Sequence, residues 1–153
     1  MFDAKQLLFD VIASFRTKLF QNKNNLELHF DENTGNQLQG DPLKIKQLIG
    51  NLFSFIESIN TSNNISLSIV FEPINNDQKT ILKINLKDQS SVKAYEIWNA
   101  LQAGASFHSI KNRQGSLLAL IVIQELTAIL KGEMAILSNE NNTGNSYYLT
   151  LCF

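Results

Sequence analysis

The chain has 153 residues, of which 44% are hydrophobic and 18% charged, and its formal net charge is −1. A chain of this length buries about two-thirds of the surface that it exposes when unfolded, which suffices for one globular domain. The Lys and Arg residues are scattered rather than gathered in a stripe, and no run of about 18 apolar residues occurs, so we expect neither a nucleic-acid partner nor direct membrane contact.

The N-terminal part of the chain predicts a helix followed by a strand. Apolar residues recur at steps of three and four over Ala4–Phe20, which is the pattern of an amphipathic helix, and Asp3 is placed to cap it. Leu26–Phe30 alternates apolar and polar residues as a half-buried strand does. A polar loop is expected over Asp31–Gln39.

A second helix and a hairpin follow. Asp41 and Pro42 predict the helix start, because Asp accepts free amide hydrogens and Pro tolerates the first helical position; the helix is expected to end near Asn60. Ile65–Phe71 and Ile81–Leu86 predict two strands of a hairpin. Their alternation indicates that one face of the sheet is covered and the other open.

The stretch Lys87–Gln114 predicts a long irregular connection with a short helical patch over Ala94–Leu101, and connections of this length are usually functional. The apolar segment Ser116–Leu130 fits a buried strand or a buried helix, and its length favours the helix. Gly132 fits a C-terminal cap of that helix.

Two strands, Glu133–Leu137 and Ser146–Phe153, are expected to close the fold. The single cysteine, Cys152, is interpreted as a small buried or edge hydrophobe rather than a reactive thiol. The order of elements predicts an α+β fold, with a mixed, mostly antiparallel sheet of about five strands packed on three helices in two layers.

This order of elements, together with several local strings, resembles the histidine-kinase branch of the GHKL ATPases, whose domains have the Bergerat fold. Residues 40–52 read GDPLKIKQLIGNL and are similar to the family's G-D-P-x-R-L-x-Q-I-L-x-N-L stretch, which opens the helix carrying its asparagine box. Residues 122–126 and 130–134 are similar to the family's I-V-x-x-L and L-M-G-G-x-I strings. The resemblance covers residues 1–153 as one ATPase-like domain, expected to be a fragment of a longer protein.

The resemblance implies an ATP site whose metal-binding box is altered here. The family's N-x-x-x-N-A-x-K box supplies an amide that binds magnesium and a lysine near the phosphates. Asn51 matches the first asparagine, whereas Phe55 stands at the magnesium position and Ser58 at the lysine. Because magnesium takes oxygen ligands and phenylalanine has none, we expect no metal site, and Phe55 is interpreted as core.

The two glycine boxes of the family are altered as well. The first, D-x-G-x-G, keeps its adenine-binding aspartate as Asp88, but Ser90 replaces the first glycine. The second, G-x-G-x-G-L, opens the last helix at the phosphates and keeps Gly115, followed by Ser116, while its other glycines are replaced by Leu117 and Ala119. Ile97 and Trp98 occupy the phenylalanine box, and the family's lid corresponds to residues 88–114.

Several of these residues have an ordinary structural interpretation besides the functional one. Asp88 is either an adenine contact or a turn aspartate, and Asn51 either a remnant catalytic amide or a polar residue at a helix edge. Lys111 and Arg113 fit phosphate contacts or solvated loop residues. Neither His29 nor His108 is followed by the family's phosphoacceptor string H-E-x-x-x-P, so neither is expected to be phosphorylated.

The resemblance therefore predicts a degenerate ATPase domain of a bacterial sensor histidine kinase or phosphorelay protein, without a bound cofactor and without enzyme activity, that docks or regulates. The alternative is an active catalytic domain that binds Mg-ATP and phosphorylates a histidine in a separate domain. A third reading is the docking portion of a histidine phosphotransfer protein. The expected partners are a dimerisation and phosphoacceptor domain and a response-regulator receiver domain, and the expected location is cytoplasmic, on its own or as part of a membrane-anchored sensor.

Overall fold

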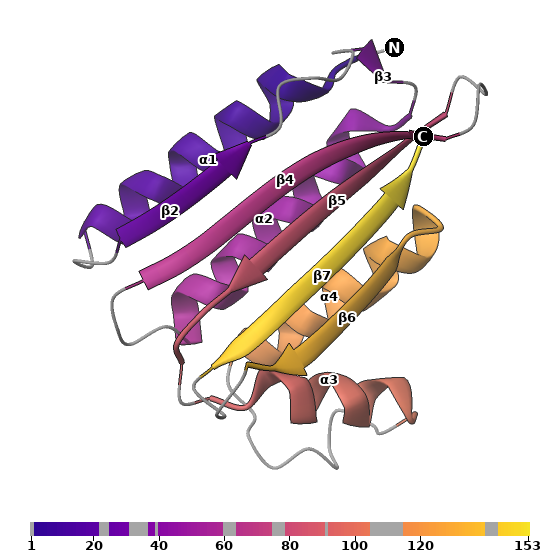
Figure 1. Cartoon of the computed structure of the whole chain (residues 1–153). Helices are drawn as coiled ribbons and strands as arrows, with labels where there is room; N and C mark the ends of the chain where they lie inside the picture. The colour runs from indigo at the N-terminus through magenta and orange to yellow at the C-terminus, as the bar shows by residue number, and fades with distance from the viewer. Residues whose placement is uncertain are drawn as a thin grey trace.

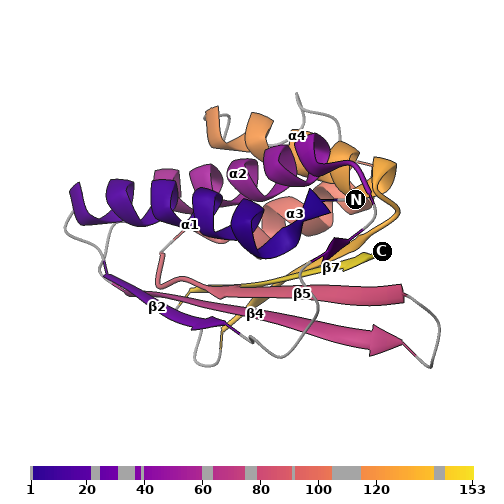
Figure 2. The same cartoon turned by 90° about the horizontal axis from the view of Figure 1, so that it is seen from above.

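A computed structural model of the chain describes residues 2–21, 25–30, 37–38, 40–59, 64–74, 79–90, 92–104, 115–139 and 144–153. One layer is a five-stranded sheet of β2 (Asn25–Phe30), β4 (Asn64–Ile74), β5 (Lys79–Lys87), β7 (Asn145–Cys152) and β6 (Glu133–Ser138), in that order. The other layer holds the long helices α1 (Ala4–Gln21), α2 (Pro42–Ile59) and α4 (Gly115–Ile129), which cover one face of the sheet (Figures 1 and 2). The predicted α+β class and sheet are confirmed.

Strand β2 is parallel to β4, and the other neighbouring pairs are antiparallel, so the sheet is mixed as predicted. The short helix α3 (Ala94–Gln102) is a fourth helix and lies beside β6 (Figure 1). A separate two-stranded ribbon pairs β1 (Phe2–Asp3) with β3 (Gln37–Leu38). The sequence analysis missed this ribbon, because two-residue strands are too short to produce a periodic pattern.

Both predicted helix starts are confirmed by side-chain caps. The Oδ1 atom of Asp3 accepts a hydrogen bond from the backbone N–H of Gln6 at 3.0 Å, although Asp3 is itself the last residue of β1. The Oδ1 atom of Asp41 accepts one from the N–H of Lys44 at 3.2 Å. Each cap satisfies a backbone donor that the helix leaves free, which stabilises the fold by about 1 kcal/mol.

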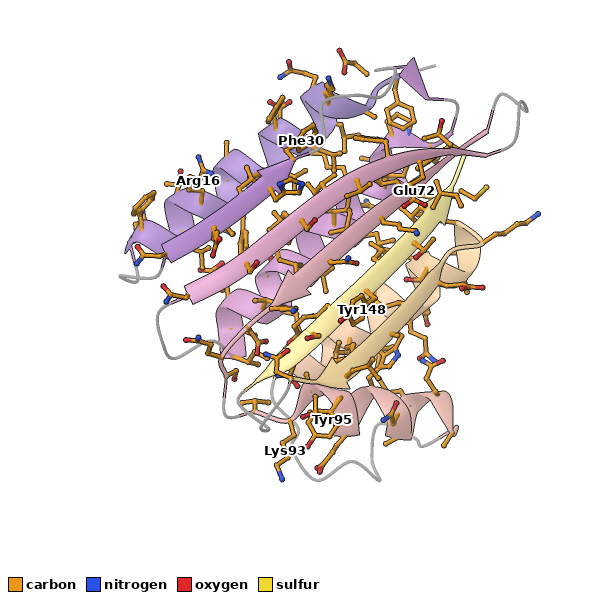
Figure 3. The ribbon with its side chains drawn as sticks, viewed as in Figure 1. Arg16, Phe30, Glu72, Lys93, Tyr95 and Tyr148 are labelled. Atoms are coloured by element: carbon orange, nitrogen blue, oxygen red, sulfur yellow. The ribbon has the colours of Figure 1, made fainter. Side chains whose placement is uncertain are left out.

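The core lies between the sheet and the three long helices, and every second residue of the central strands faces it. In α1 and α2 the apolar stripes meet where the rings of Phe15 and Phe53 stack with centroids 4.4 Å apart. The opposite face of the sheet is open and largely polar: the adjacent strand pairs align His29 with Ser68, Ser68 with Asn85, and Asn85 with Tyr148 (Figure 3 labels Tyr148). The expectation of one covered and one open face is confirmed.

The segment that fitted a strand or a helix is the helix α4, and Gly132 belongs to its C-terminal cap, as expected. The left-handed residue is Lys131, with a φ of 54°, and the N–H of Gly132 donates to the carbonyl of Thr127 at 2.9 Å, which completes a Schellman motif. Gly132 is needed for space instead, because a Cβ there would lie 2.8 Å from the carbonyl oxygen of Thr150 and 2.5 Å from a methyl carbon of Leu151.

Cys152 is exposed rather than buried, because it falls on the outward phase of the alternation in β7. The other alternative, an edge residue, agrees with the register, since the pairing of β7 with β6 ends at Thr150 and Cys152 pairs with β5 alone. Among the residues that the structure describes, no helix is both long and apolar enough to cross a membrane.

Replacing glycine by alanine should have opposite effects on stability at Gly132 and at Gly50. We expect Gly132→Ala to lower the free energy of unfolding by about 1–3 kcal/mol, because the new methyl group overlaps the neighbouring strand. We expect Gly50→Ala to raise it by about 1 kcal/mol, because Gly50 lies inside α2 and a Cβ there meets nothing within 4 Å. Urea unfolding of both variants measures the difference, and equal effects would contradict this packing.

Candidate functional site

Asp88, which the resemblance matches to the family's adenine-binding aspartate, follows the last residue of β5 and is completely buried. Alternate residues of this strand face the core, and Asp88 continues the phase of Leu82, Ile84 and Leu86 one residue beyond the strand. Its exposed fraction is 0%. A buried carboxylate costs several kcal/mol unless hydrogen bonds replace its water, so its partners determine what the site can do.

The carboxylate of Asp88 receives all of these hydrogen bonds from the chain itself. Its Oδ1 atom accepts from the backbone N–H of Ser90 at 3.1 Å, and from the backbone N–H and the side-chain amide of Asn145 at 2.9 and 3.1 Å. Its Oδ2 atom accepts from the hydroxyl of Tyr147 at 2.5 Å. The side-chain amide of Asn145 also lies 3.5 Å from Oδ2, so both oxygens of the buried carboxylate have donors within the chain.

Tyr147 closes the site on the side of the helices. Its side chain is fully buried, and its ring meets that of Phe55 edge to face, with centroids 6.3 Å apart and planes inclined by 76°. Burial raises the pKa of Tyr147 well above its ordinary value of 10.0, and the negative charge of Asp88 and the hydrogen bond to it raise it further. Tyr147 therefore stays protonated and remains a donor to Asp88.

Asn145 connects this carboxylate to the beginning of α3. Its side-chain amide donates to the carbonyl of Val92 at 2.8 Å, and its Oδ1 atom accepts from the N–H of Tyr95 at 3.3 Å. The backbone N–H of Asp88 donates to the carbonyl of Asn145 at 3.0 Å. These contacts hold the first part of the expected lid, up to α3, against the end of the sheet.

Residues of the β6–β7 hairpin complete the network around Asp88. The amide of Asn139 donates to the backbone carbonyl of Asp88 at 2.8 Å, and its Oδ1 atom accepts a hydrogen bond from Ser146. Gly144 has a φ of 144°, and a Cβ there would lie 2.1 Å from the same carbonyl oxygen. Only glycine lets the hairpin approach this closely.

Ser90, which replaces a glycine of the family's first box, links this region to α2. Its hydroxyl donates to the carbonyl of Ile59, the last residue of α2, at 2.6 Å and accepts from the N–H of Val92 at 3.0 Å. The side chain of Ser90 is buried, and its hydrogen bonds join the turn after β5 to the end of α2.

The structure places Phe55, Ser58 and Asn51 on α2, each with a contact inside the chain. Phe55 is 1% exposed and belongs to the core, as predicted. The exposed Ser58 donates to the carbonyl of Phe55 at 2.6 Å, and the half-buried Asn51 donates to the carbonyl of Gln47 at 2.7 Å. Within the described parts of the chain, no group of three or more His, Cys, Asp or Glu residues is placed to hold a metal ion.

The other expected site residues are only partly placed. Gly115 begins α4, but the side chains of residues 115–117, including Ser116 and Leu117, lie outside the described residues, as do Lys111, Arg113 and His108. Ala119 is half-buried against the core. In α3, Trp98 is buried and Ile97 packs against the core. His29 is exposed on the open face of the sheet.

Sequence reasoning missed the residues that engage Asp88. Asn145 and Tyr147 occupy the inward face of β7 together with Leu149 and Leu151, and two polar residues on the buried side of a strand were the available signal. The signal could not be used without the pairing of β5 with β7, which sets Tyr147 opposite Leu86, two residues before Asp88.

We expect Tyr147→Phe to lower the free energy of unfolding by about 1–3 kcal/mol at pH 7, because Asp88 loses its Oδ2 donor inside the protein. The stabilisation linked to Tyr147 is fully present below its unfolded pKa near 10 and is lost as the pH rises toward the raised folded pKa, because only the unfolded state then releases the proton. The difference between wild type and variant should therefore shrink above about pH 10.

Denaturant unfolding across this pH range measures the difference, with Tyr148→Phe as the matched control. Tyr148 is the next residue of β7 and its side chain faces the open side of the sheet, 37% exposed. Its substitution should change the stability by less than about 0.5 kcal/mol. Equal effects of the two substitutions would contradict the assignment of Tyr147 as the donor to Asp88.

Comparison with known proteins finds the fold but no relative by sequence. No family model matches the chain, and no curated protein sequence does. Solved structures do match. The Acinetobacter baumannii histidine kinase AdeS superposes with a TM-score of 0.64 at 22% identity, covering 98% of this chain and 64% of that chain.

Two further histidine kinase structures agree. Full-length ShkA, solved in complex with AMPPNP, has a TM-score of 0.69 at 14% identity; the match covers 98% of this chain and 30% of that one. The catalytic domain of histidine kinase ThkA has a TM-score of 0.63 at 16% identity, and the match covers 98% of this chain and 92% of that one. This chain thus spans less than two-thirds of the AdeS and ShkA chains and nearly all of the ThkA domain. It has the fold of a histidine kinase-like GHKL ATPase domain, as its motifs predicted.

Proposed function

We propose that this chain is a histidine-kinase-type ATPase domain that has lost Mg-ATP binding and serves as a docking or regulatory module in a two-component pathway. Its partners would be a dimerisation and phosphoacceptor domain and the receiver domain of a response regulator, in the cytoplasm. The fold supports the assignment to such a pathway. The site supports the loss of nucleotide binding.

The occupied carboxylate of Asp88 is the observation that carries this proposal. Recognition of adenine at this position requires the carboxylate to accept a hydrogen bond from the base. Here Asn145 and Tyr147 already provide side-chain donors to both carboxylate oxygens. A nucleotide would have to displace a buried hydrogen bond, and each donor or acceptor left unsatisfied costs about 1–3 kcal/mol.

The metal side of the site supports the same proposal. Phosphoryl transfer depends on positioning and on neutralising the phosphate charge, which magnesium provides in this family. At the magnesium position the buried ring of Phe55 contacts Tyr147 and offers no oxygen. Adenine recognition and metal binding would therefore fail together.

We expect no heat of binding and no change in melting temperature when the purified chain is titrated with millimolar ATP and Mg²⁺. A ligand at about one hundred times its dissociation constant would add about 2.7 kcal/mol of stability, which a thermal scan detects. A histidine kinase catalytic domain that binds ATP serves as the positive control. Magnesium-dependent binding in the micromolar range would refute the proposal and restore the alternative of an active catalytic domain.

The docking role predicts binding to a pathway partner without nucleotide. Purified receiver domains and dimerisation domains from the source organism can be tested by biolayer interferometry against the immobilised chain. We expect at least one of them to bind at micromolar concentration, with an affinity that Mg-ATP does not change. If no receiver or dimerisation domain binds, the docking role is refuted, even if the titration finds no binding of ATP.

A further inference from the structure

The outer surface of the helix layer carries a groove between α1 and α2, and this groove is not used by the site described above. The two helices lie side by side and start at the same end of the molecule (Figure 2). At that end, Leu7 and Leu43 line a cavity of about 310 Å³. It continues into a second cavity of about 270 Å³, because Asp10 and Lys46 line both.

The groove has an apolar floor and an open centre. Phe15 and Phe53 line the second cavity from below, and Leu43, 63% exposed, stands at the entrance of the first. The centre is lined by Ser14 and Gly50, and the space around Gly50 is open, since a Cβ there meets no atom within 4 Å. Small residues at the centre allow another helix to approach closely.

Charged residues lie at both ends of the second cavity, and the sign of the charge changes from one end to the other along each helix. On α1 the negative Asp10 precedes the positive Lys18 by eight residues, or about 12 Å along the helix. On α2 the positive Lys46 precedes the negative Glu57 by eleven residues, or about 16 Å. Each helix thus carries opposite charges at the two ends of the same cavity.

This pattern is complementary to its own copy. Consider a second copy related by a two-fold axis that lies in the plane of the groove and runs perpendicular to the helices. This rotation places α1 of the second copy antiparallel on α1 of the first, and α2 of the second copy antiparallel on α2 of the first. Asp10 then faces Lys18 of the other copy, and Lys46 faces Glu57, each pair occurring twice. The midpoint is Ser14 on α1 and lies between Asn51 and Leu52 on α2, about 2 Å along the helix from Gly50. Ser14 and Gly50 line one cavity, so a single axis passes close to both midpoints and satisfies all four pairs.

We propose that the α1–α2 groove is the interface of a homodimer of this chain. Each helix has 18 residues and is about 27 Å long, and two helices present a face about 20 Å wide. Two such faces would bury about 1,000 Å² in total, at the lower limit of specific interfaces. The homodimer is therefore weak, forms at micromolar concentration or above, and loosens as salt screens its charges.

Sedimentation equilibrium of the whole chain from about 1 μM to about 1 mM tests the proposal. We expect a reversible dimer whose dissociation constant rises at least about tenfold in Lys18→Asp and in Asp10→Lys, because each variant replaces two attractive contacts with two repulsive ones. The double variant Asp10→Lys/Lys18→Asp restores opposite charges across the axis and should return the dissociation constant to within about threefold of wild type. Lys46→Glu tests the α2 contacts separately.

Arg16→Glu is the matched control, because it reverses a charge on the same helix outside both cavities (Figure 3 labels Arg16). It should leave the dissociation constant unchanged, and melting curves of all variants confirm that they fold. A chain that stays monomeric up to millimolar concentration overturns the proposal. A dimer that the groove variants leave intact, or that the double variant fails to restore, overturns it as well.

Discussion

The buried carboxylate of Asp88 is the constraint on which this end of the molecule depends. A carboxylate without water must be surrounded by donors, and here they come from segments far apart in the chain: the turn after β5 through Ser90, and β7 through Asn145 and Tyr147. The sheet pairing, the approach of the β6–β7 hairpin and the position of α3 all meet at this group. Removing one donor therefore weakens the contacts of β5, β7 and α3 with one another at the same time.

The same hydrogen bonds give Asp88 a structural role. The resemblance to histidine-kinase ATPase domains assigns the position of Asp88 to adenine recognition. Here Tyr147 donates to the carboxylate and packs on Phe55, which stands where the resemblance places the magnesium ligand. The residues that the resemblance assigns to adenine and to magnesium thus belong to one packed arrangement, which supports the proposed docking role over catalysis.

Much of the fold could be predicted from the pattern of residues, because amphipathic periods and helix caps are local signals. The stripe over Ala4–Phe20 and the cap at Asp41 gave helices whose observed bounds differ by a residue or so. The sequence analysis failed where the determining contact is distant in the chain. Gly132 is required by the closeness of β7 rather than by the helix end, and Cys152 faces outward because the pairing of β7 fixes its phase.

The sequence by itself determined the fold class and the burial of Phe55, because these depend on residue type and local period. Only the tertiary structure shows which groups surround the carboxylate of Asp88. Its two interpretations, adenine contact or turn residue, differ in which partners surround the carboxylate, and those partners lie 57 and 59 residues further along the chain. Hydrogen bonds between such distant residues depend on strand pairing, which local patterns do not specify.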